Sequence, residues 1–132
     1  KDIKPNLIKK GDNCTVIASG YSVYLSKLAF DKIDKNKKFD LFDLRKLTNI
    51  SFTEIFESIK KTGKLLVVDG GTTYSGFSAE IISQICESKF FKYLKSSPKR
   101  LALPDHPAPT SSNEEINYYF NEDDIVKILK KI

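Results

Sequence analysis

The sequence predicts a three-layer α/β/α domain in which helices cover both faces of a five-stranded mixed sheet. Two observations predict it. Short apolar runs at residues 14–18 and 65–68 alternate with segments whose apolar residues recur at helical spacing. Strands that alternate with helices are typical of a mostly parallel sheet buried on both faces. A third observation makes the sheet mixed, because a short turn joins the first two strands and predicts that they pair antiparallel.

The chain up to Arg45 gives three strands and one helix. A turn at Gly11 joins strand 6–10 to strand 14–18, and Ser22 begins a helix with one apolar face. Residues 39–44 form the next strand, and Asp43 and Arg45 at its end are interpreted as bracing the following turn, with a ligand contact at the carboxyl edge of the sheet as the alternative.

The second helix and the fourth strand come next. Ser51 is the expected N-cap, with Glu54 completing a capping box, and Gly63 ends this helix. Strand 65–68 then ends at Asp69.

A glycine-rich stretch after that strand is the candidate ligand loop. Its glycines are expected to turn the backbone where a Cβ would clash, and its hydroxyls lie where the next helix begins. A strand, a turn and a helix start together suit an anion, although the spacing matches no dinucleotide fingerprint. The candidate residues are Gly70, Gly71, Thr72, Ser75 and Gly76.

The C-terminal third ends in a last strand, a proline segment and a helix. The helix from Gly76 reaches about Phe90, and residues 99–103 form the fifth strand. Three prolines make residues 104–109 an irregular surface strap. Asn121 caps the final helix.

Composition narrows the class of protein. The 132 residues form one domain, and Lys1 in place of Met suggests excision from a longer chain. The net charge of +5 comes mainly from dispersed lysines, which predicts a solvated surface and no nucleic-acid binding. No apolar run could cross a membrane. Cys14 and Cys86 are interpreted as buried free thiols of a cytoplasmic protein.

Five segments resemble the C-terminal domain of transketolase-like, thiamine-diphosphate-dependent enzymes. In order, they are residues 11–20, 42–47, 61–69, 76–81 and 105–109. The Asp-Leu-Arg turn and the proline strap are most similar to the β subunit of 2-oxo-acid dehydrogenases of the pyruvate, branched-chain or acetoin type. The chain departs from the family at two positions. The family often has an acidic residue where Gly70 stands and a proline where Asn49 stands.

This resemblance implies a non-catalytic domain for subunit assembly and docking. Thiamine diphosphate and Mg²⁺ would be held by other domains of the parent enzyme, so no residue here is expected to bind cofactor or metal, or to catalyse. The partners would be those cofactor-binding domains, a second copy in a homodimer, and a dihydrolipoyl acyltransferase. The alternative is a transketolase or deoxyxylulose-phosphate synthase domain with a small-anion regulatory site at the glycine loop.

The expected interface combines the helix that begins near Gly76, the strap and the C-terminal helix. A strap stiffened by prolines loses little entropy when a partner buries it. The aromatic run at residues 118–120 fits either a core or an interface, and His106 is interpreted as an exposed loop residue. The candidate interface residues are Asp105, Pro107, Pro109, Tyr119 and Ile132.

Overall fold

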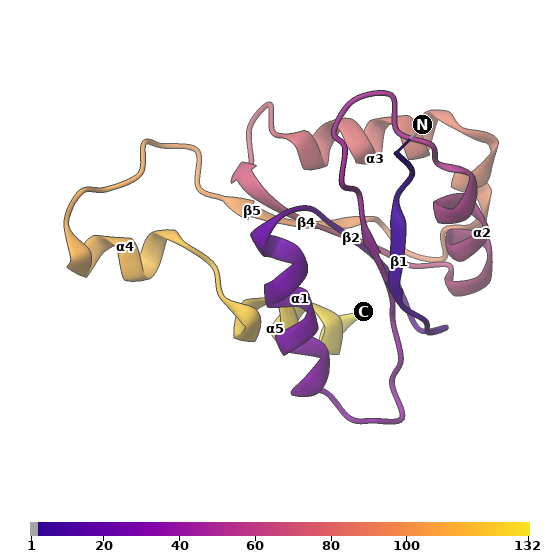
Figure 1. Ribbon diagram of the computed structural model, residues 1–132, viewed down its shortest axis with the longest axis horizontal. Helices are drawn as coiled ribbons and strands as arrows, with labels where there is room; N and C mark the ends of the chain where they lie inside the picture. The colour runs from indigo at the N-terminus through magenta and orange to yellow at the C-terminus, as the bar shows by residue number, and fades with distance from the viewer. Residues whose placement is uncertain (1–2) are drawn as a thin grey trace.

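A computed structural model describes residues 3–132, so Lys1 lies outside the described residues. A five-stranded mixed sheet lies between two layers of helices, as the sequence predicts (Figure 1). The strands are β1 (Asn6–Lys9), β2 (Thr15–Ala18), β3 (Asp40–Asp43), β4 (Leu65–Thr72) and β5 (Lys99–Leu103). The helices are α1 (Tyr21–Asp31), α2 (Thr53–Thr62), α3 (Phe77–Glu87), the 3₁₀ turn η1 (Lys89–Tyr93), α4 (Ser112–Tyr118) and α5 (Glu122–Lys131).

The strand order β1-β3-β2-β4-β5 corrects one prediction. β1 is the antiparallel strand, as expected, but it pairs with β3, and the predicted pairing of the first two strands is wrong. Residues 10–14 cross the start of β3, where the amides of Asp12 and Asn13 donate to the carbonyl of Lys38 at 3.2 and 3.0 Å. Strands lie about 4.8 Å apart and an extended residue spans about 3.3 Å, so this short connection can skip one strand.

The two faces of the sheet bury separate apolar clusters. Alternate residues of a strand point to opposite faces, which divides the continuous apolar runs of β2 and β4 between the clusters. Val16 and Leu66 pack with α1 and α5 on one face. Ile17 and Val67 pack with α2 and α3 on the other, which explains why both runs are apolar except at Thr15.

The predicted helix boundaries at Gly63 and Asn121 are confirmed, and the predicted N-cap at Ser51 is not. Gly63 ends α2 with φ of 68°, and Asn121 forms a capping box with Asp124 at the start of α5. The predicted cap at Ser51 is wrong, because Phe52 is the N-cap residue of α2 and its side chain makes no capping bond. The Phe52 ring is buried and stacks on Phe56 with centroids 5.4 Å apart, so apolar packing fixes this helix start.

The C-terminal half differs from the prediction in two places. The helix expected to reach Phe90 ends at Glu87, and the chain continues as η1 after Ser88, whose hydroxyl accepts from the amide of Phe90 at 3.2 Å. The second difference is α4, a short helix that no periodicity indicated. Its apolar residues lack a helical repeat because most of this helix is exposed.

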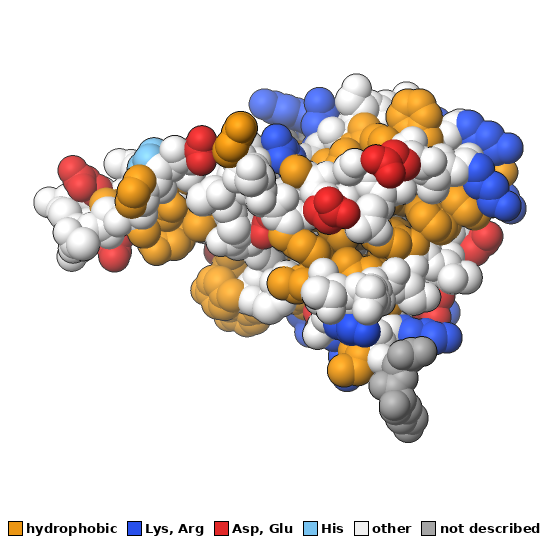
Figure 2. Space-filling view, turned by 90° about the horizontal axis from the view of Figure 1, so that it is seen from above, with side chains coloured by type: hydrophobic (Ala, Val, Ile, Leu, Met, Phe, Trp, Pro, Cys, Tyr) orange, Lys and Arg blue, Asp and Glu red, His pale blue; other side chains and the backbone are white. Residues whose placement is uncertain are grey.

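Residues 104–120, hereafter the arm, project from the body of the domain (Figure 1). The arm comprises the proline strap, which is irregular as predicted, and α4. Figure 2 shows acidic and apolar side chains sharing the arm, whereas the Lys and Arg side chains lie on the body of the domain. The stretch 101–126 holds six of the 17 acidic residues of the chain and none of its 22 Lys and Arg residues.

Candidate functional site

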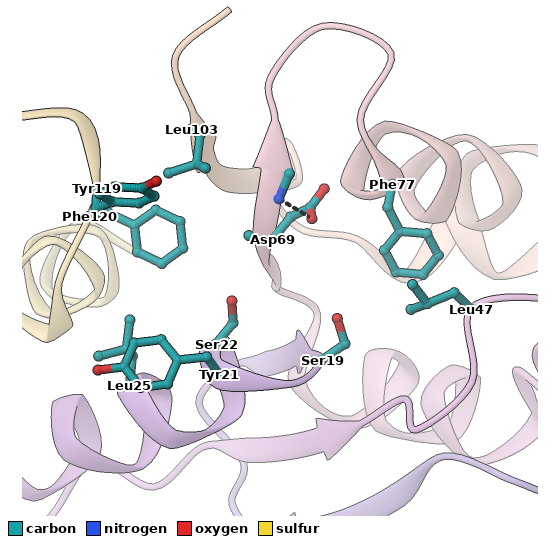
Figure 3. Close-up of a pocket in the computed structure, with 12 residues that line it drawn as sticks. Ser19, Tyr21, Ser22, Leu25, Leu47, Asp69, Phe77, Leu103, Tyr119 and Phe120 are labelled. Carbon is teal, nitrogen blue, oxygen red and sulfur yellow. Dashed lines mark hydrogen bonds between the residues drawn. The ribbon is translucent and has the colours of Figure 1, made fainter. Parts of the chain in front are cut away.

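The carboxyl ends of β2, β4 and β5 surround a cavity of about 570 Å³ (Figure 3). Ser19 follows β2, residues 69–71 belong to β4, and Leu103 ends β5. Open α/β sheets bind ligands at this edge, outside the carboxyl ends of the strands. The fold therefore provides a hollow where this architecture usually places a site.

Two apolar walls face each other across the cavity. Figure 3 shows Tyr21, Tyr119 and Phe120 on one side, and Leu47 and Phe77 on the other. The side chains of Tyr21, Leu47 and Tyr119 are 72%, 53% and 51% exposed, so the rim of the cavity is apolar. Exposed apolar groups that gather in one place indicate a binding or assembly surface.

The floor of the cavity carries an unpaired hydroxyl. Ser22, at the start of α1, is 4% exposed, and its Oγ has no partner within residues 3–132 but remains open to the cavity, whereas the fully enclosed hydroxyl without a partner in that range is Ser78 Oγ. Figure 3 shows the Ser22 hydroxyl directed into the cavity, as is that of Ser19. Sequence reasoning missed Ser19 and Ser22, because a serine at a helix start is usually interpreted as a cap.

Asp69 lies between the two walls and is 5% exposed. Its Oδ1 accepts the amide of Gly71 at 2.8 Å, and its Oδ2 accepts the amide of Ser78 at 2.7 Å. The carboxylate thus caps α3 from the preceding strand, which is favourable at a helix N-terminus. These two amides are therefore not free to bind an anion. The carboxylate also places its own negative charge beside the loop where the sequence suggested an anion site.

The glycines of the candidate loop have different roles from those expected. Gly70 and Gly71 do not form the turn, since β4 continues to Thr72 through a bulge opposite β5. A Cβ on Gly70 would meet only Ser22 Oγ, at 3.9 Å, so the predicted clash there is wrong. The steric requirement lies at Gly76, where a Cβ would collide with the carbonyl oxygen of Thr72.

The remaining loop residues hold the turn between β4 and α3. The Thr72 hydroxyl donates to the carbonyl of Tyr74 at 3.0 Å, and Ser75 has φ of 52°. The structure brings Gly70 and Gly71 to the cavity, whereas Thr72, Ser75 and Gly76 do not line it. The small-anion site at this loop stays a prediction.

The turn after β3 is braced by hydrogen bonding. Asp43 Oδ1 accepts the backbone amide of Arg45 at 3.1 Å, and Arg45 has φ of 58°. Asp43 therefore stabilises a left-handed residue, and neither side chain lines the cavity.

The candidate interface residues lie in two places. Asp105, Pro107, Pro109 and Tyr119 belong to the arm, and all but Pro109, which is half-buried, are exposed. Ile132 instead packs against the cluster beneath α1 and α5. Its carbonyl oxygen accepts Lys64 Nζ at 2.6 Å.

The aromatic run at residues 118–120 contains one buried and one exposed tyrosine. Tyr118 is buried, donates its hydroxyl to the carbonyl of His106 at 3.0 Å, and packs against the His106 ring. Tyr119 meets Tyr118 edge-on and is half exposed. The arm therefore has a small fold of its own, with His106 exposed as predicted.

A buried polar network at the opposite edge of the sheet was also missed. Asp40 is 2% exposed and accepts the Gly11 amide at 2.8 Å, the Ser58 hydroxyl at 2.5 Å and Lys61 Nζ at 2.7 Å. The Thr15 hydroxyl joins Ser58 at 2.7 Å and Thr62 at 2.8 Å. The i, i+4 spacing of Ser58 and Thr62 was the available signal, since it places two hydroxyls on one helix face.

Other features of the described residues bear on function, namely groups of metal ligands, membrane-spanning helices and reactive cysteines. Within residues 3–132, no three His, Cys, Asp or Glu side chains are grouped to hold a metal ion, and no helix there has the length and apolar character to cross a membrane. Cys14 is buried as predicted, whereas the predicted burial of Cys86 is wrong because it is only half-buried; both are free. Burial raises the pKa of the Cys14 thiol from 9.0 to about 12, so this thiol is a poor nucleophile.

Comparison with known proteins identifies the relatives of the chain. The family described as "Transketolase, C-terminal domain" matches residues 4–125. The pyruvate dehydrogenase E1 component subunit beta of Mycoplasma pneumoniae is 35% identical over 117 residues, which are 88% of this chain and 35% of that protein. The 2-oxoisovalerate dehydrogenase subunit beta of Bacillus subtilis is 30% identical over 131 residues, which are 98% of this chain and 40% of that protein.

A solved structure shares the fold. The protein named "Split gene transketolase, inactive beta4 tetramer" superposes with a TM-score of 0.76 at 15% sequence identity, covering 97% of this chain and 41% of that one. This likeness confirms the predicted three-layer architecture. The chain spans well under half the length of these relatives.

Proposed function

The chain belongs to the transketolase C-terminal domain family, and we propose that it is the assembly and docking domain of a larger thiamine-diphosphate-dependent enzyme. The 2-oxo-acid dehydrogenase β subunits among its relatives support this class of parent. Residues 1–132 would then be one domain of a longer protein. Thiamine diphosphate and Mg²⁺ would be bound by other domains of that protein.

The projecting arm is the observation that carries the proposal. Ile116 is 78% exposed on a segment that projects away from the sheet, and Tyr119, at the base of that segment beside the cavity, is 51% exposed. An isolated domain gains nothing by holding apolar side chains away from its core, whereas an interface buries them. Aromatic anchors such as Tyr119 are typical of interface centres.

Charge indicates what the arm meets. The arm contributes Asp105, Glu114 and Glu115 and no Lys or Arg, whereas the chain as a whole carries a net charge of +5. An acidic arm that reaches over a second copy of the chain therefore meets a basic body, and two copies can exchange arms around a two-fold axis. The subunit names of the relatives and the tetramer in the name of the fold neighbour support an oligomeric parent. The second copy is thus the proposed occupant, with an acyltransferase as a further partner.

Sedimentation of the chain tests this assembly role. We expect reversible self-association at micromolar concentrations, weakened at least tenfold by Ile116→Asp and also by the charge reversal Glu114→Lys with Glu115→Lys. Phe91→Asp is the matched control, because Phe91 is 54% exposed on η1, outside the arm. A chain that stays monomeric at 200 μM, or that dissociates equally in the control, would contradict the proposal.

Calorimetry tests the proposed absence of cofactor binding. Titration of the chain with thiamine diphosphate and Mg²⁺ should release no saturable heat, because the proposal assigns the cofactor to other domains. Binding with a micromolar Kd would contradict it.

A further inference from the structure

We propose that the cavity at the carboxyl end of the sheet binds a small, uncharged aromatic molecule that carries a hydrogen-bonding group. This site goes beyond the assembly role, and it shares Tyr119 with the proposed interface. Ile116, which tests assembly, is not among the residues that line the cavity.

The size and walls of the cavity fit a small ring compound. Small-molecule sites are mostly apolar hollows of about 300–1,000 Å³ with a few polar groups, and this cavity measures about 570 Å³. Tyr21, Phe77 and Phe120 lie on both sides of it, so a ring inserted between the walls meets aromatic surfaces (Figure 3).

Ser22 provides the polar contact. Ser22 Oγ has no partner within the described chain, is directed into the cavity and is accessible from it, so it is free to bond to a ligand there. A hydroxyl can both donate and accept, so an amide, carbonyl or hydroxyl on a ligand would satisfy it. Ser22 is 4% exposed, and this depth favours a small molecule over the surface of another protein.

Gly70 leaves room beside that hydroxyl. Its φ is not positive, and a Cβ added to it would have only Ser22 Oγ nearby, at 3.9 Å, so neither backbone nor packing requires a glycine there. A glycine inside a strand often marks a place where a ligand approaches the backbone closely. Here the glycine lies in the bulge of β4, next to the unpaired hydroxyl.

The charge of the cavity favours an uncharged ligand over an anion. Asp69 is the one ionisable carboxylate among the lining residues, and no Lys or Arg lines the cavity in the described chain. Both Asp69 oxygens accept backbone amides, which fixes the position of this carboxylate beside the cavity. An uncharged ligand avoids repulsion from this carboxylate and keeps the contact with Ser22.

The probe pair benzamide and benzoate tests the proposal, because the two share a ring and differ in charge. In a titration of the ¹⁵N-labelled chain, benzamide should shift the amides of Ser22, Gly70 and Leu103 saturably with a millimolar Kd. Benzoate should bind at least tenfold more weakly. Absence of saturable shifts with benzamide, or equal binding of benzoate, would overturn the proposal.

Variants locate the binding. Ser22→Ala should weaken the binding of benzamide about three- to tenfold, as expected for the loss of one hydrogen bond. Gly70→Val should weaken it at least tenfold while the chain stays folded by circular dichroism, because a β-branched residue suits a strand. Ser83→Ala, on the exposed face of α3, should change nothing.

Two further outcomes would also overturn the site. One is benzamide binding that neither Ser22→Ala nor Gly70→Val affects. The other is self-association that protects Ser22 and Gly70 and excludes benzamide, since this would assign the cavity to a second copy. Failure of the assembly test alone would leave the site standing, because Ile116→Asp does not alter the cavity.

Discussion

The two edges of the sheet use the same kinds of polar residue in opposite ways. At the amino edge, Asp40, Ser58 and Thr15 are buried and joined to one another by hydrogen bonds. At the carboxyl edge, Ser22 is equally buried but unpaired within the described chain, and it faces a cavity. One edge is closed by its own contacts and the other is open, and the open edge has groups left for a partner or ligand.

Loss of Asp40 should give the largest effect. Asp40→Ala removes the acceptor of the Gly11 amide, the Ser58 hydroxyl and Lys61, and leaves buried donors unpaired. We expect a decrease of about 2–4 kcal/mol in the free energy of unfolding, measured with urea. Asp12→Ala, at an exposed carboxylate, is the control and should change it by less than about 0.5 kcal/mol. Equal stability of the two variants would contradict a closed amino edge.

Two glycines at the open edge form the next comparison. Gly76→Ala places a Cβ against the carbonyl oxygen of Thr72 and should cost about 2 kcal/mol. Gly70→Ala enters open space and should lie within about 0.5 kcal/mol of the wild type. Thermal unfolding of both variants measures the difference. A large loss in Gly70→Ala would show that the fold, rather than a ligand, requires that glycine.

Two serines compare the edges directly. Ser58→Ala removes hydrogen bonds to Asp40 and Thr15 and should cost about 1–2 kcal/mol. Ser22→Ala removes no bond within the described chain and should change stability by less than about 0.5 kcal/mol. Urea unfolding of the two variants should therefore separate a structural hydroxyl from an unused one. Similar losses would contradict the distinction.

Loss of an exposed ionic contact, which lies at neither edge of the sheet, should have the smallest effect on stability. Lys32 joins α1 to α5 through Glu122 at 2.9 Å and Asp123 at 2.8 Å. The hydrogen bond from Lys32 lowers the pKa of Glu122 below its usual 4.5. The stabilisation is therefore present above pH 4.5 and is lost as pH falls through the lower pKa of the folded state. The urea midpoint of unfolding, measured at about pH 7 and about pH 3.5, should therefore fall less in Lys32→Met than in the wild type.

Several features were predictable because they depend on local sequence. The apolar runs at 14–18 and 65–68 indicated strands buried on both faces, and Gly63 and Asn121 ended and began helices as expected. Ser51 was misleading, because the packing of Phe52 outweighed its capping preference. The arm was predictable only as a strap, since α4 is short and exposed and has no apolar period.

The sequence by itself determined the layers, the mixed sheet and the family, because periodicity, turn residues and ordered motifs are properties of neighbouring residues. Tertiary structure alone decided that β3 separates β1 from β2, since the short connection at residues 10–14 permits either pairing. It alone decided which hydroxyls are satisfied. Ser58 meets Asp40 across 18 positions, whereas Ser22 meets an open cavity, and both outcomes depend on contacts between segments that are distant in the chain.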